Sequence, residues 1–163
     1  MSADLRTELG AMLDEYDAAR RAAEVQRQRV HDDEAAFVAQ FAELRRDVVR
    51  PVFEAAAEVL KNRGHALEIR EAEFGKEGGK IREAAIAVRV TPAGMEGAAA
   101  ADEHRRELSF TTRHYSRTVS VVNGAVPQSG AMAGAQGSRA LAQISTQLVE
   151  EELLRLVAEL VRR

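Results

Sequence analysis

The residues best suited to acid–base or metal chemistry in this chain are four histidines, His31, His65, His104 and His114. No two of them are spaced to place a pair of ligands on one helical turn, and Cys is absent. Glu103-His104 and His114 fall on neighbouring predicted strands, where a carboxylate beside an imidazole is suited to general acid–base catalysis. No nucleophile or third orienting group accompanies them. We therefore expect no catalytic residues, no metal and no cofactor, although the sequence does not exclude an enzyme.

Arginines on the predicted strands form a second group with possible chemistry. By alternation Arg89 and Arg105 lie on the outer face of the sheet, where we also place His114. A guanidinium or a protonated imidazole binds anions, so these three residues are the candidate anion or ligand contacts. Ion pairing of the arginines with Glu103 and Glu107 is the competing interpretation.

Residues 123–138, with the sequence NGAVPQSGAMAGAQGS, are small, uncharged and rich in Gly. They precede a predicted helix, whose free N–H groups favour anions. However, no Lys-Ser or Lys-Thr follows the glycines and no parallel strand leads into them, so the phosphate-loop and dinucleotide fingerprints are not met. We predict a flexible loop here. Together with the sheet face, it is the site of an alternative function, that of a small-ligand carrier or an enzyme.

The composition describes one folded domain of ordinary size. The chain has 163 residues, of which 45% are hydrophobic and 30% charged. A net charge of -3 argues against nucleic acid as the partner. The chain has neither a signal-peptide start nor 18 uninterrupted apolar residues, so we expect no membrane association and a cytoplasmic location.

Apolar residues alternate with polar ones between His65 and Val122, which predicts four strands. They centre on residues 67–69, 86–90, 108–110 and 119–121. The connections are too short for crossover helices, so the strands form an antiparallel meander. A last helix, beginning after Ser138, has a wide apolar stripe and covers the sheet. The predicted fold class is α+β.

Residues 3–63 are dominated by strong helix formers and predict one long helix. At about 1.5 Å per residue it would reach about 90 Å, whereas a compact chain of this size is about 40 Å across. The helix must therefore protrude, fold back near His31, or bend at Pro51. We expect a kink at Pro51, which separates a helical arm (residues 1–50) from an α+β domain (residues 51–163).

A seven-residue apolar repeat in the arm favours a coiled coil. Its first line is Leu9, Tyr16, Ala23, Val30, Phe37 and Leu44, and its second line is Leu5, Met12 and Ala19, followed by the polar Gln26, Asp33 and Gln40. A continuous zipper, a discontinuous or antiparallel pairing, and packing on the chain's own sheet remain open. We expect an assembly or adaptor protein that is not an enzyme and that forms a homodimer, a higher even oligomer or a complex with a helical protein. The expected interface is Leu9, Met12, Tyr16, Val30, Phe37 and Leu44.

Overall fold

A computed structural model describes residues 2–94, 106–125 and 135–162 of the chain. The chain divides into two compact units, Met1–Ala36 and Phe37–Arg163. Its elements confirm the α+β class, with a long helical segment first, an antiparallel sheet next and a helix last.

Helical residues follow one another without a gap from Ala3 to Asn62, in three parts. Helix α1 (Ala3–Leu44) begins at Ser2, whose hydroxyl accepts a hydrogen bond from the Leu5 N–H at 3.1 Å, and continues through His31. A π-helical turn (Arg45–Val49) follows, and then helix α2 (Arg50–Asn62). Pro51 lies in the first turn of α2, where its missing N–H is tolerated. The kink expected at Pro51 stays a prediction, and the feature seen next to it is a change of helix type just before the proline.

The first unit consists of the Ala3–Ala36 part of α1, about 50 Å of helix at 1.5 Å per residue. Every residue from Ser2 to Asp33 is exposed. Exposed pairs on the helix surface, such as the Gln28 amide with the Asp32 carboxylate at 2.9 Å, add local support. The unit contributes no residue to the buried core, because every buried apolar residue among those described lies between Phe37 and Leu156.

The second unit contains a five-stranded antiparallel sheet in the order β1-β4-β5-β6-β7. The strands are β1 (Ala66–Ala72), β4 (Ala85–Thr91), β5 (Arg106–Arg113), β6 (Thr118–Ala125) and β7 (Ala135–Arg139). The first four are the strands predicted from alternation. Strand β7, which pairs Val121 with Gly137, was not predicted. Residues 123–125 and 135–138 are therefore strand and not loop, while residues 126–134 lie outside the described residues.

A separate hairpin joins β1 to β4, within a connection that was predicted to be too short for a crossover helix. Strands β2 (Gly75–Glu77) and β3 (Lys80–Arg82) pair across Gly78 and Gly79. The φ values of these glycines are 57° and 78°, which suits the two-residue turns that match strand twist.

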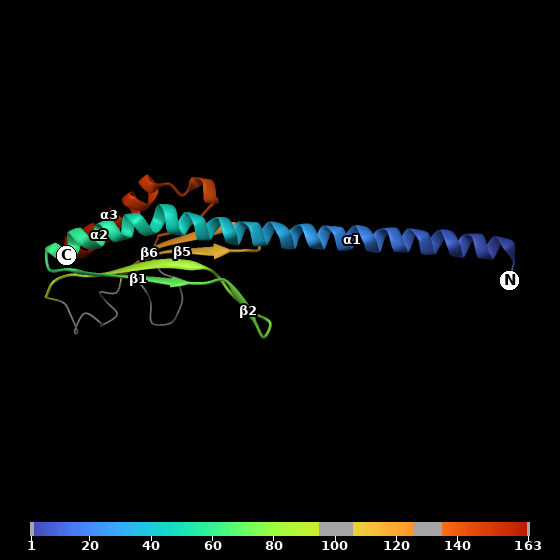
Figure 1. Ribbon diagram of the computed structural model, residues 1–163, viewed down its shortest axis with the longest axis horizontal. Coiled ribbons are helices and arrows are strands. Elements are labelled where there is room, and N and C mark those ends of the chain that lie inside the picture. Colours follow the sequence, from blue (N-terminus) through green and yellow to red (C-terminus); the bar gives the residue numbers. More distant parts are fainter. Residues whose placement is uncertain (1, 95–105, 126–134, 163) are drawn as a thin grey trace. The chain divides into compact units, whose positions relative to one another are not determined.

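The last helix, α3 (Thr146–Val161), begins later than predicted. Ser145 is its N-cap and accepts a hydrogen bond from the Leu148 N–H at 3.1 Å, whereas the expected cap, Ser138, lies in β7. As expected, α3 packs on the sheet, and Figure 1 shows it on the same side of the sheet as α2. The core between these helices and the sheet contains Phe41, Val49, Phe53, Ile86, Val88, Leu108, Phe110, Val119, Val149 and Leu156, all fully buried.

Candidate functional site

The exposed apolar line of the first unit is the strongest candidate for a binding surface. Leu5, Leu9, Met12 and Tyr16 follow one another at spacings of four, three and four residues, which places them on one face of α1. Met12 and Tyr16 are 66% and 63% exposed, and Leu5 and Leu9 are more than 40% exposed. Single exposed apolar residues are common in proteins, but a line of four on one helix face suits a contact with another helix.

The six predicted interface residues divide into two groups. Leu9, Met12, Tyr16 and Val30 are exposed in the first unit. Phe37 is buried in the core of the second unit, and Leu44 packs against that core, so both side chains already have apolar neighbours in their own chain. The surface described here is therefore restricted to residues 5–30 and is called the N-terminal seam: Leu5, Leu9, Met12, Tyr16, Ala19, Ala23, Gln26 and Val30.

Of the predicted anion contacts, the structure describes Arg89 and His114 and does not bring these two together. Arg89, on β4, lies 3.7 Å from the Glu107 carboxylate, which also accepts a hydrogen bond from Arg70 at 2.8 Å. Ion pairing with Glu107 therefore accounts for Arg89, as the competing interpretation proposed. Arg105 lies outside the described residues, as do Glu103 and His104.

His114 is not on the outer face with Arg89. It follows β5 and has the parity of Phe110 and Thr112, both of which are buried, and at about 3.3 Å per residue it lies roughly 20 Å along the sheet from Glu107. Its Nδ1 is 3.0 Å from the Glu83 carboxylate, and its backbone N–H donates to the same group at 3.2 Å. The prediction grouped His114 with Ser116, Thr118 and Ser120 of the following strand, whereas His114 continues the alternation of β5, whose even-numbered residues from Leu108 to Thr112 are buried.

The contacts of His114 hold a turn in place. The imidazole packs against Phe74 at a ring distance of 5.5 Å and meets Tyr115 edge-on at 5.7 Å. The Glu83 carboxylate thus joins the segment before β4 to the turn after β5, because both the backbone N–H and the imidazole of His114 contact it. Within the described ranges, no three His, Cys, Asp or Glu side chains gather in a way that could hold a metal ion.

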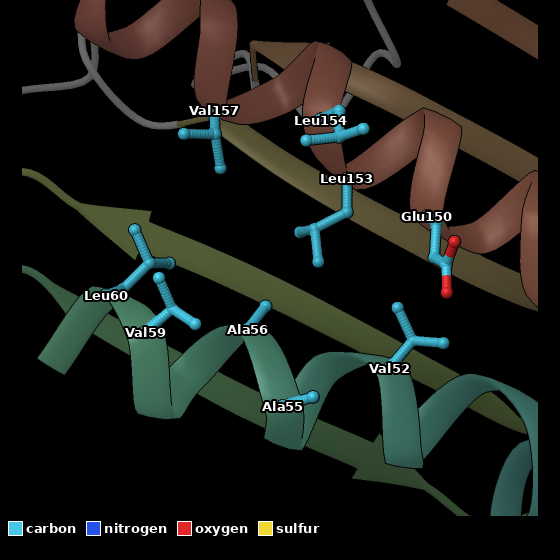
Figure 2. Close-up of a pocket in the computed structure, with 9 residues that line it drawn as sticks. All are labelled: Val52, Ala55, Ala56, Val59, Leu60, Glu150, Leu153, Leu154 and Val157. Atoms are coloured by element: carbon cyan, nitrogen blue, oxygen red, sulfur yellow. The ribbon is translucent and has the colours of Figure 1, made fainter.

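An apolar groove lies between α2 and α3 on the second unit, and the sequence analysis missed it. Its volume is about 450 Å³, and it is lined by Val52, Ala55, Ala56, Val59, Leu60, Glu150, Leu153, Leu154 and Val157. Figure 2 shows the side chains of the two helices pointing toward one another across it, with Glu150 the one charged group. Val59 and Leu154 are 60% and 70% exposed. The sequence of α3 contained a signal for this groove, because the apolar residues of α3 cover a wider part of its circumference than the face that packs on the sheet.

Comparison with known protein families, with curated proteins and with solved structures finds no match for this chain. In the part of the chain that the structure describes, none of the helices combines the length and apolar character that crossing a membrane requires.

Proposed function

We propose that this protein is an assembly or adaptor protein that is not an enzyme, and that its N-terminal seam pairs with another helix, from a second copy or from a helical partner. The observation that carries the proposal is the exposed line of Leu5, Leu9, Met12 and Tyr16 on a helix with no core of its own. A helix held only by local interactions is marginal in water, because most helical stability in proteins comes from packing an apolar face. Pairing supplies that packing.

The test compares one charge placed on the seam with the same charge placed off it. Leu9→Glu puts a carboxylate in the seam, whereas Ala18→Glu puts one on an exposed position outside it. We expect the full-length protein to sediment as an assembly at micromolar concentration, or to co-purify with a helical protein. Leu9→Glu abolishes the association, because burying an unpaired charge costs several kcal/mol. Ala18→Glu retains it. A monomer with no seam-dependent partner contradicts the proposal.

The α2–α3 groove supports a second candidate function, the binding of a small apolar ligand. Its volume falls within the range of about 300–1,000 Å³ that is typical of ligand sites, and its lining is almost entirely aliphatic. This site differs from the sheet face and loop of the alternative derived from sequence. We expect an apolar fluorescent probe to bind the protein and Ala56→Trp, which fills the groove, to remove the binding. Equal binding to both proteins would contradict this function.

A further inference from the structure

The N-terminal seam is unequal along its length, and this bears on how two copies would align. Its large side chains, Leu5, Leu9, Met12 and Tyr16, lie in the first half of the unit. The second half offers the small Ala19 and Ala23, then Gln26 and Val30, and Asp33 follows the end of the seam. Only an alignment that brings the two first halves together matches large apolar residues with one another, and such matching gives a coiled coil most of its stability.

The charges beside the seam distinguish the possible alignments. In a parallel, in-register coil, the residue that directly precedes each first-line residue, such as Tyr16 or Val30, faces the residue five positions further along the other helix. Glu15 then faces Arg20 of the second copy, and Arg29 faces Glu34 of the second copy. Each pair occurs twice in a symmetric dimer, and both pairs have opposite charges.

These charges are available for contacts between copies. Among the described residues, Glu15, Arg29 and Glu34 form no ion pair or hydrogen bond through their side chains. Arg20 forms one exposed ion pair, 3.9 Å from Asp17, and such pairs contribute little. At three of these four positions, a contact with the second copy therefore breaks no existing interaction of the side chain.

Antiparallel alignments either bring like charges together or place the large apolar side chains opposite small or polar ones. Overlap of residues 5–30 places Leu9 opposite Gln26 of the second copy, and its repulsive Arg6–Arg27 pair offsets its attractive Glu8–Arg29 pair. A shorter overlap can unite Leu5 with Tyr16 and Leu9 with Met12, but it places Glu8 opposite Glu15 of the second copy. Like charges facing each other across a coil select against that pairing.

We infer that the partner of the N-terminal seam is a second copy of this chain, aligned parallel and in register and selected by the Glu15–Arg20 and Arg29–Glu34 pairs. The inference rests on the proposed function and adds the identity and direction of the partner. The parallel alignment stacks Gln26 on Gln26, which fixes register, and brings Asp33 to face Asp33. Repulsion between the two Asp33 carboxylates opposes pairing beyond Val30, so the Arg29–Glu34 pair marks the end of the coil and the Glu15–Arg20 pair contributes most to the selection.

The first experiment tests direction with cysteines, and the natural chain contains none. Under mild oxidation of the full-length protein, Met12→Cys alone should form a disulfide-linked dimer, because the two Met12 positions share a layer only in the parallel alignment. The antiparallel overlap of residues 5–30 would instead link Met12→Cys to Ala23→Cys in a mixture. The shorter overlap would link Met12→Cys to Leu9→Cys. Either of these mixed products without the Met12→Cys homodimer overturns the inference.

The second experiment tests the charge pairs by mixing two variants. Either Glu15→Arg or Arg20→Glu places like charges opposite each other at both Glu15–Arg20 contacts of the dimer. Each variant should therefore raise the dimer Kd by roughly 4- to 30-fold. Their mixture forms a heterodimer with both pairs restored, and the double variant regains the wild-type Kd. The matched control is Asp14→Arg mixed with Arg21→Glu, which changes the same charges on the face away from the seam and should give no preferred heterodimer.

The outcomes separate the inference from the proposed function. A wild-type dimer that Leu9→Glu dissociates, but that shows neither the Met12→Cys disulfide nor recovery on mixing, keeps the proposed function and overturns the parallel alignment. A full-length protein that is monomeric by itself but captures a helical partner through Leu9 overturns the inference in the same way. A monomer with no such partner overturns both.

Discussion

Arg45 is a buried arginine, in a chain where most arginines are at the surface. It lies in the π-helical turn and its guanidinium reaches the ends of two strands, donating to the Ala72 carbonyl at 3.0 Å and the Ala85 carbonyl at 3.2 Å. It also donates to the Glu73 carboxylate at 2.7 Å. A planar guanidinium carries five donors spread over three nitrogens in a fixed geometry, whereas a Lys has three donors on a single nitrogen.

Replacing Arg45 with Met should lower the free energy of unfolding by about 2–4 kcal/mol, because two backbone carbonyls lose their donor in a region closed to water. Arg46→Met is the matched control. Arg46 is exposed and pairs with the neighbouring Asp47, so the change should stay within about 0.5 kcal/mol. Chemical denaturation of the three proteins measures both effects. Equal losses in the two variants would show that Arg45 is not a structural tie.

At the scale of elements, α3 contributes two different surfaces from neighbouring residues. Leu156 is fully buried against the sheet, whereas Leu154 is 70% exposed at the α2–α3 groove. The polar pair of Asn123 and Glu152 adds a tie to β6, in which the Asn123 amide donates to the Glu152 carboxylate and backbone carbonyl, both at 2.8 Å. The helix is thus part of the core and also one wall of a groove.

Leu156→Asp should destabilise the protein by several kcal/mol, because it buries a charge without a partner. Leu154→Asp places the same group two residues away in an exposed position and should change stability little. Thermal unfolding followed by circular dichroism measures the difference. A midpoint for Leu156→Asp equal to that of the wild type would mean that α3 is peripheral, contrary to its packing here.

At the scale of the whole molecule, the two units differ in what holds them together. The second unit has its own apolar core, and that core includes Phe37 and Phe41 from the last part of α1. A stable fragment must therefore begin at about Phe37. A boundary at residue 50, as sequence alone suggested for the domains, removes both phenylalanines and Arg45.

Removing residues 1–36 should leave a cooperatively folded protein that has lost its self-association. Removing residues 1–48 should leave one that is strongly destabilised, since losing a buried Phe alone costs about 3–5 kcal/mol. Circular dichroism and sedimentation of both fragments test this. If the shorter fragment, residues 49–163, were as stable as the longer one, Phe37 and Phe41 would have no essential role in the core.

Much of the fold was predictable because its signals are local. Two-residue alternation around Ile86–Val90 and Leu108–Phe110 identified the inner strands, and helix-forming composition identified the continuous segment from Ala3 to Asn62. Strand β7 was missed because its sequence, AQGSR, lacks alternation, and its conformation depends on hydrogen bonds with β6. Local patterns report the preference of a segment, and an edge strand of small residues has little preference of its own.

The sequence by itself determined the apolar repeat, in which Tyr16, Val30, Phe37 and Leu44 look alike. Only the tertiary structure decided that Phe37 and Leu44 belong to the chain's own core while Tyr16 and Val30 remain exposed. Likewise, nothing in the sequence distinguished Arg45, and His114 was a candidate anion contact, whereas the fold placed the first under two strand ends and the second against Glu83. The reason is physical: a repeat specifies which face of an element is apolar, but what covers that face depends on segments distant along the chain.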